Sequence, residues 1–246
     1  MMVLALDIST SSGWAIFEDG KPTYFGQIKC KVEGNERSED YPYNYYKMAE
    51  TMADELCQLA IKYYPEFIVV EETNKGKNRY HQKQLEYIHC MFVGRIKGLA
   101  KLETKCQLRY ISTSRWRKVL NIGLDSEQRI FNKQIKVERD QHKQKLHLEF
   151  CKKYEWEMKL KLELALGKRI KNQIAKEYSD IIESEVNTEM RKFRVKRESK
   201  VVGKINPKHL SINYVNEKFK MNFKTKDNDI SDAFCIGTAF IEMGNI

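Results

Sequence analysis

Two short apolar runs that each end in an acidic residue constrain the fold of this chain most strongly. Residues 2–6 are followed by Asp7, and residues 67–70 are followed by Glu71. Runs of this length and composition predict buried β-strands. Open α/β sheets place their chemistry at strand ends, so Asp7 and Glu71 are candidate site residues. Glu72 would face the opposite side of the strand, and we choose Glu71 because the apolar run ends there.

A further pair of acids lies near the C-terminus, where Asp229 and Asp232 stand three residues apart. On a helix this spacing places both carboxylates on one face, where they can reach the same ion. The alternative explanation for Asp229 is a helix N-cap, which Asp227 or Asn228 could also provide. Together with the two strand-end acids, the pair predicts a cluster of four carboxylates from three distant elements.

Cysteine and histidine spacing bears on the kind of metal site. The chain has 246 residues with six cysteines and five histidines, and it contains no CxxC, HxxxH or HxH pattern. Zinc is therefore disfavoured, and a hard, oxygen-liganded ion matches the acids better. We expect His81 and His89 to be polar helix residues rather than ligands. The sequence shows no signal peptide and no 18-residue apolar run, which predicts a cytoplasmic protein without a membrane partner.

Positive charge is concentrated in one segment. The chain has a net charge of +10, and residues 125–204 hold 21 of its 44 Lys and Arg but 14 of its 34 Asp and Glu. An excess of Lys and Arg predicts a polyanionic partner. The segment contains no proline, and apolar residues recur at helical spacing over 130–150 and 170–193. We predict an inserted helical hairpin; a flexible charged loop is the alternative, and the strict alternation over 156–164 fits either a strand or a helix.

The remaining chain predicts one α/β domain formed by residues 1–124 and 205–246. Asp19-Gly20 between apolar runs indicates a β-hairpin. Helical periodicity over 45–64 and 85–99 precedes the strands at 67–71 and 108–111, respectively. The order β-β-β-α-β-α-β predicts a mixed five-stranded sheet flanked by helices. Asn206 followed by Pro207 predicts the start of another helix, and a final helix should begin near Asp229.

Three segments in this order resemble the RuvC-type Holliday junction resolvases, members of the RNase H-like superfamily, in a phage or other viral branch. The segments are residues 4–14, 65–72 and 229–234. The resemblance covers residues 1–123 and 205–243. It implies an RNase H-like fold, metal binding by Asp7, Glu71, Asp229 and Asp232, two divalent ions, a homodimer, and paired nicks in a four-way DNA junction.

The sequence departs from bacterial members of this family at two places. The aromatic residue that probes unstacked bases three positions after the catalytic glutamate is replaced by Asn74, and Tyr80 is the candidate substitute. The basic residue after the fifth strand corresponds to Trp116 or a neighbour, so its role could fall to Arg115 or Arg117. The insertion has no counterpart in the compact bacterial enzymes.

These observations predict a magnesium-dependent endonuclease that resolves four-way (Holliday) junctions and other branched DNA. Two Mg²⁺ ions, for which Mn²⁺ can substitute, would activate water and neutralise developing charge. Lys208 and Lys226 are candidates for phosphate contact, with solvated surface lysines as the alternative. Rival functions are an ATPase or kinase of the actin-like superfamily, although a second phosphate loop is absent, and a non-catalytic DNA-binding protein. A viral protein would act in the host-cell cytoplasm or at the viral replication site.

Overall fold

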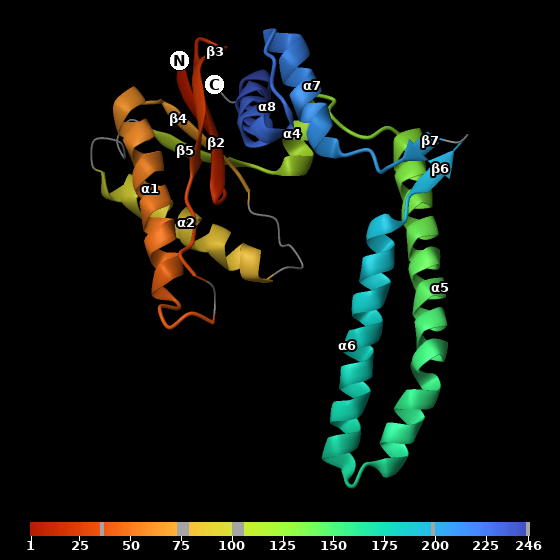
Figure 1. Ribbon diagram of the computed structural model, residues 1–246. Coiled ribbons are helices and arrows are strands. Elements are labelled where there is room, and N and C mark those ends of the chain that lie inside the picture. The colour runs from red at the N-terminus through yellow and green to blue at the C-terminus, as the bar shows by residue number, and fades with distance from the viewer. Residues whose placement is uncertain (35–36, 73–78, 100–105, 198–199, 245–246) are drawn as a thin grey trace. The chain divides into compact units, whose positions relative to one another are not determined.

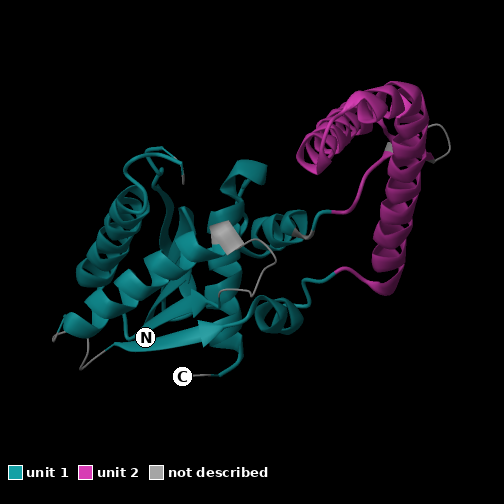
Figure 2. Ribbon diagram, turned by 90° about the horizontal axis from the view of Figure 1, so that it is seen from below, with its two compact units in different colours: residues 1–123, 206–246 teal, residues 124–205 magenta. Residues whose placement is uncertain are grey.

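The chain folds into two compact units in the computed structural model (Figure 2). The structure describes the chain except residues 35–36, 73–78, 100–105, 198–199 and 245–246. The first unit comprises Met1–Gly123 and Asn206–Ile246, and the second, called the arm below, comprises Leu124–Ile205. The limits expected from the sequence lie one residue away from these. Among the described residues, no helix combines the length and the apolarity needed to span a membrane.

A mixed five-stranded sheet forms the centre of the first unit, as predicted. Its strands are β1 (Met2–Asp7), β2 (Ser11–Glu18), β3 (Lys21–Lys29), β4 (Phe67–Glu71) and β5 (Gln107–Ile111). They are ordered β3-β2-β1-β4-β5, with β2 antiparallel to β1 and β3, and β1, β4 and β5 parallel. This is the arrangement of the RNase H-like fold. The predicted turn between β2 and β3 has left-handed φ angles of 48° at Asp19 and 81° at Gly20.

Helices cover both faces of this sheet (Figure 1). On one face pack α1 (Tyr43–Tyr63) and α2 (Arg79–Gly98), and on the other α4 (Thr113–Val119), α7 (Pro207–Phe219) and α8 (Asn228–Glu242). Each face has its own apolar core, because alternate strand residues point to opposite sides. In β1, for example, Leu4 and Leu6 contribute to the first core, and Val3 and Ala5 to the second.

The two C-terminal helices begin close to the predicted positions. The side chain of Asn206 accepts a hydrogen bond of 3.0 Å from the backbone N–H of Lys208, and Pro207 occupies the first turn of α7. A short 3₁₀ helix (Thr225–Asp227) leads into α8, whose N-cap position is Asp227. The capping explanation for Asp229 is therefore wrong, and its carboxylate is available for other contacts.

The arm is a helical hairpin, as predicted, followed by a small β-hairpin. Its helices are α5 (Ser126–Leu164) and α6 (Lys168–Lys192), and its strands are β6 (Val195–Arg197) and β7 (Lys200–Val202). The alternating segment 156–164 belongs to α5, which shows that the helix-forming residues there outweigh the alternation. The β-hairpin was not predicted.

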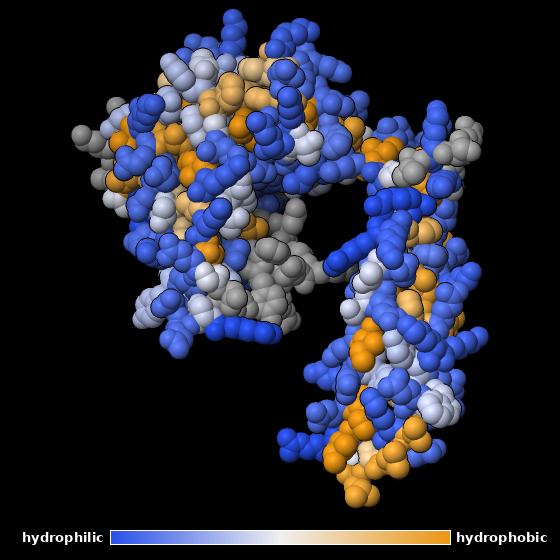
Figure 3. All heavy atoms as spheres, viewed as in Figure 1, coloured by the Kyte–Doolittle hydropathy of each residue, from blue (hydrophilic) through white to orange (hydrophobic). Residues whose placement is uncertain are grey.

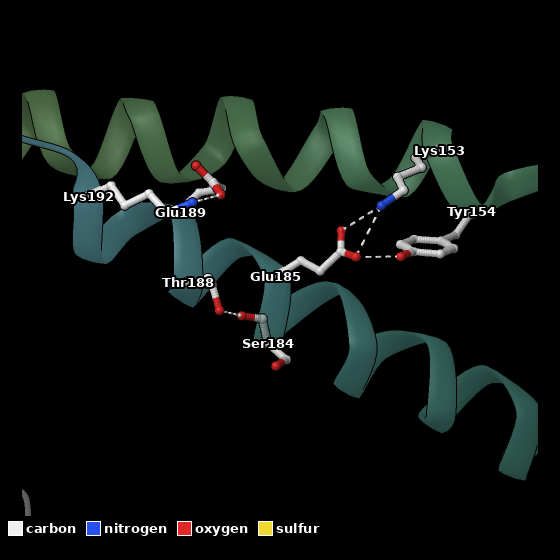
Figure 4. A network of polar contacts seen from close by, with 7 residues as sticks. All are labelled: Lys153, Tyr154, Ser184, Glu185, Thr188, Glu189 and Lys192. Carbon is white, nitrogen blue, oxygen red and sulfur yellow. Dashed lines mark hydrogen bonds and ion pairs between the residues drawn. The ribbon is translucent and has the colours of Figure 1, made fainter.

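Packing and polar contacts hold α5 against α6. Tyr178, Ile182 and Val186 of α6 are buried, so the apolar stripe of this helix is used within the arm. In Figure 4, Lys153 and Tyr154 of α5 reach the same carboxylate, Glu185 of α6. Exposed apolar side chains gather at the closed end of the hairpin, where Figure 3 is orange. They are Trp156, Leu160, Leu164, Leu166 and Ile170.

Candidate functional site

The parallel pairing of β1 with β4 brings the two strand-end acids together. The register pairs the residue before Asp7 with the residue before Glu71. Ala5 and Val69 lie two positions before these acids and are buried in the core beneath α4, α7 and α8. Since side chains alternate along a strand, Asp7 and Glu71 point to that same face. Glu72 is exposed, which agrees with the choice of Glu71 over Glu72.

The other two acids enter from α8, which packs on this face. Asp229 lies in the first turn of α8, and Asp232 lies one turn further and is 6% exposed. The Oδ2 atom of Asp229 accepts hydrogen bonds from Ser11 Oγ at 2.8 Å and from Gln27 Nε2 at 2.7 Å. These bonds tie the start of α8 to β2 and β3, so the orientation of the Asp229 carboxylate is set by the sheet.

Gly13 allows α8 to approach the sheet this closely. It pairs with Asp7 in the β1–β2 ladder. A Cβ atom at this position would lie 1.9 Å from the backbone carbonyl oxygen of Asp229, a distance that no pair of non-bonded atoms tolerates. A glycine here therefore permits Asp229 to lie beside the end of β1.

The four acids, Asp7, Glu71, Asp229 and Asp232, form what we call the acid cluster, and they influence one another electrostatically. The pKa of Asp7 is raised well above its usual value, first by burial and then by the charges of Glu71, Asp232 and Asp229. Burial also raises the pKa of Asp232 to about 6, and the charge of Glu71 adds to this shift. Like charges that share a partly desolvated site disfavour ionisation. A bound divalent cation would reverse that preference.

Residues that follow β5 surround Glu71. Thr113 Oγ1 donates a hydrogen bond to Glu71 Oε1. The buried indole N–H of Trp116 completes no hydrogen bond, yet it is close enough to lower the pKa of Glu71, and Arg117 acts in the same direction. Burial is the largest influence and leaves the pKa raised. Glu71 is thus held by polar neighbours but is still incompletely compensated.

Unpartnered polar atoms gather around the acid cluster. Within the described part of the chain, the buried side-chain atoms without a hydrogen-bond partner include Trp116 Nε1, Arg117 Nε, Ser211 Oγ and Asp232 Oδ1. Arg117 and Ser211 both lower the pKa of Asp232, so they lie close to it. Buried polar atoms are normally satisfied. A hydrated cation would satisfy the acceptor Asp232 Oδ1, whereas the N–H groups of Trp116 and Arg117 require acceptor atoms. The oxygen-rich donor set fits Mg²⁺ or Mn²⁺.

The four carboxylates are not close enough together for three of them to bind one metal ion. In the ranges that the structure describes, no three Asp, Glu, His or Cys side chains are close enough together to hold one metal ion. The acids therefore lie within electrostatic reach of one another but outside ligating geometry. To hold one ion with three carboxylates, their side chains must rotate.

The predicted DNA-contacting residues fall into two groups. Lys208 is exposed at the start of α7 and lowers the pKa of Asp7, Glu71 and Asp232. Arg117 lowers the pKa of Glu71 and of Asp232. These two cations border the acid cluster. Arg115 and Lys226 are exposed, and their side chains contact no other described residue through a hydrogen bond or ion pair. Tyr80 is in the first turn of α2, and its side chain lies outside the described residues.

His89 is a polar helix residue, as expected, but it lies next to the site. Burial lowers its pKa to about 4, and it hydrogen-bonds to the backbone of Ile8, the residue after Asp7. The imidazole is therefore neutral at pH 7 and supports the loop that follows β1.

Sequence reasoning missed the residues that orient the acids. Ser11 and Gly13 lie within the motif at 4–14, so a signal for them was present. Thr113 follows β5 at the start of a short helix, where Ser and Thr are common. No signal in the sequence connects Gln27 to Asp229.

Comparisons with known proteins give similarities at the level of structure. No protein-family model matches the chain, and no curated protein sequence matches it significantly. The RuvC protein of Thermus thermophilus in complex with a Holliday junction substrate has 11% sequence identity and a TM-score of 0.38, with 49% of this chain and 69% of that chain covered. A second T. thermophilus RuvC structure has 13% identity and a TM-score of 0.37, with the same coverage.

The yeast mitochondrial Holliday junction resolvase Ydc2 has 13% identity and a TM-score of 0.43, with 98% of this chain and 77% of that chain covered. All three scores are below 0.5, so they assign no function to this chain.

Proposed function

We propose that this protein is a divalent-metal-dependent endonuclease that cleaves branched DNA, with the four-way junction as its main substrate. The observation that carries the proposal is that Asp7, Glu71, Asp229 and Asp232 lie at one end of the sheet, where burial and the charges of the other three acids raise the pKa of Asp7. The motif resemblance to RuvC-type resolvases supports the same chemistry. On this proposal the protein acts as a homodimer that nicks two strands, and it belongs to a phage or other viral branch that functions in the host-cell cytoplasm.

Each part of the acid cluster has a defined task in this proposal. Asp7 is bordered by the other three acids and would ligate two Mg²⁺ ions, with Glu71 and Asp229 each contributing to one of them and Asp232 completing the second site. When bound, these ions would activate water and stabilise charge on the cleaved phosphate. Thr113 orients Glu71, and Ser11 with Gln27 orients Asp229.

The cations at the border of the acid cluster would contact the substrate. Lys208 and Arg117 both lower the pKa of Glu71 and of Asp232. Lys208 also lowers the pKa of Asp7. A phosphodiester placed against the acid cluster would bring further negative charge, which these two side chains offset. Their removal should therefore weaken substrate binding more than it alters metal binding.

An actin-like ATPase is less well supported. The described residues contain one five-stranded sheet and one two-stranded sheet, whereas the actin-like architecture repeats its α/β domain. We therefore retain the nuclease as the proposed function.

A nicking assay tests the proposal directly. A labelled four-way junction and a linear duplex of the same arm sequence are incubated with the protein, with and without Mg²⁺. We expect Mg²⁺-dependent nicks in the junction and much slower cleavage of the duplex. ATP turnover without DNA would instead favour the actin-like function. DNA binding without cleavage in either Mg²⁺ or Mn²⁺ would favour a non-catalytic binding protein.

A further inference from the structure

Most of the net positive charge of the arm lies in residues 191–204. Residues 191–204, called the basic hairpin below, carry seven Lys or Arg and one Glu, a net charge of +6. Residues 125–190 carry fourteen Lys or Arg and thirteen Asp or Glu, a net charge of +1. The span 125–190 is thus nearly neutral, and the excess charge lies at the C-terminal end of α6 and on and beside β6 and β7.

The basic hairpin is attached firmly to α5. Asn132 of α5 makes two hydrogen bonds to the backbone of Ile205, of 3.0 and 2.7 Å. The Phe193 ring stacks on His142 with centroids 4.0 Å apart and planes 18° apart. Val195 of β6 is buried, at 4% exposed. These contacts anchor the two ends of the basic hairpin to α5.

The described cations of the basic hairpin are exposed. Val195 is buried and side chains alternate along a strand, so Lys196 lies on the opposite face of the β-hairpin from Val195, and the strand register places Lys200 on the same face as Val195. Lys196, Lys200 and Lys204 are all exposed. Within the described ranges, Lys200 and Lys204 pair with no carboxylate. In contrast, Lys192 pairs with Glu189 at 2.7 Å, and Lys159 of α5 pairs with Glu155 at 2.8 Å.

The described residues of the basic hairpin include no large exposed apolar side chain. The large exposed apolar residues of the described arm lie in 130–170, and none lies among the described residues of 191–204. A surface that binds a lipid membrane combines cations with exposed apolar side chains, whereas a surface for nucleic-acid phosphates needs cations alone. The chemistry of the basic hairpin therefore matches a phosphate backbone.

We infer that the basic hairpin is a phosphate-binding surface that holds duplex DNA independently of sequence. This inference rests on the proposed function, because it names a second contact for the same DNA substrate. Lysines on a fixed β-hairpin would contact the duplex backbone and release its counterions. The nearly neutral span 125–190 would contribute little to this binding.

Two matched triple variants test the inference. The first is Lys196→Gln with Lys200→Gln and Lys204→Gln, in the basic hairpin. The second is Lys145→Gln with Lys159→Gln and Lys171→Gln, all exposed on the arm helices. Each removes three positive charges from the arm. The two sets differ in position and in pairing, because Lys145 pairs with Glu149 and Lys159 pairs with Glu155. Affinity for a linear duplex and for a four-way junction is measured in EDTA over a range of salt concentrations, and melting curves verify folding.

We expect the first variant to bind both DNAs more weakly and with a flatter salt dependence. The slope of log affinity against log salt should fall by about 0.9 for each phosphate that the variant no longer neutralises, up to about 2.7 for three. The second variant should bind like the wild type.

Equal reductions of affinity in the two variants would overturn the inference, because net charge alone would then explain the binding. An unchanged first variant would also overturn it while leaving the proposed nuclease intact. A wild-type protein that binds no DNA would overturn both proposals. Binding of the basic hairpin to anionic phosphatidylserine vesicles in preference to DNA would assign it to a membrane instead.

Discussion

The acid cluster and the long helices of the arm place their charges in opposite ways. In the acid cluster, like charges are partly buried beside one another, and the pKa of Asp7 rises as a result. On α5 and α6, opposite charges are paired at the surface, as in Lys143 with Glu183 at 2.8 Å. Exposed pairs of this kind contribute little to stability, whereas buried like charges store unfavourable energy that a ligand can relieve. The placement of charge, rather than its amount, therefore distinguishes a candidate site from a solvated surface.

Removing the central acid should have the largest effect. Asp7→Asn deletes the carboxylate that borders the other three acids. Removal of a group that only hydrogen-bonds to a metal ligand lowers activity by up to ~100-fold. We therefore expect loss of Asp7 to lower Mg²⁺-dependent junction cleavage by more than this. Junction affinity should be retained or increased, because repulsion toward phosphate decreases. Single-turnover cleavage and gel-shift assays on the same preparation check both parts. Wild-type cleavage rates in the variant would exclude Asp7 as a metal ligand.

A matched pair of neighbouring glutamates tests the strand alternation. Glu71→Gln should reduce cleavage to a similar extent as Asp7→Asn, whereas Glu72→Gln should be mild because Glu72 is exposed. Each variant is assayed for cleavage at saturating Mg²⁺. The opposite order of effects would show that the register of β4 differs by one residue from the structure.

Removal of the arm should separate binding from catalysis. Replacing residues 125–204 with a short Gly/Ser bridge leaves the elements of the acid cluster in place, since all of them belong to the other unit. We expect the variant to fold, to bind DNA with a flatter salt dependence, and to keep its cleavage rate at saturating DNA. Anisotropy titrations and sedimentation measure affinity and oligomeric state. Unchanged affinity together with loss of a dimer would assign the arm to self-association.

The smallest predicted effect concerns stability and pH. The pKa of Asp232 is raised to about 6 from its usual 3.8, so the folded state favours its protonated form. The stability that this group contributes is fully present below pH 3.8 and is lost as the pH rises through about 6. Without metal, Asp232→Asn should therefore raise the melting temperature at pH 7.5, and the gain should shrink toward pH 5.

The exposed Asp180→Asn, measured over the same pH series, is the control. A pH-independent effect of Asp232→Asn would contradict the assignment of Asp232 as a buried, destabilised carboxylate.

The acids could be predicted from the sequence because each follows a local rule. Asp7 and Glu71 end apolar strands, and Asp229 and Asp232 share a helix face. The groups that orient them could not be predicted in the same way. The hydrogen bond from Gln27 to Asp229 joins residues 202 positions apart, and only the packing of α8 on the sheet creates it.

Local patterns also failed in the arm, for two different reasons. The alternation at 156–164 indicated a strand as well as a helix, but its residues are helix formers and α5 continues through it. The strands of the basic hairpin have three residues each, which is too short for a periodic signal. Its position depends on Asn132 and Phe193, which contact residues far away in sequence.

The location of a bound metal ion tests the central claim most directly. Crystals grown or soaked with Mn²⁺ and measured at the manganese absorption edge reveal each bound ion by its anomalous signal. We predict a peak bonded to the carboxylate of Asp7 and to at least one of Glu71, Asp229 and Asp232, with side chains rotated toward it. Ordered manganese elsewhere and none at the acid cluster would contradict the claim that these four acids form a metal site.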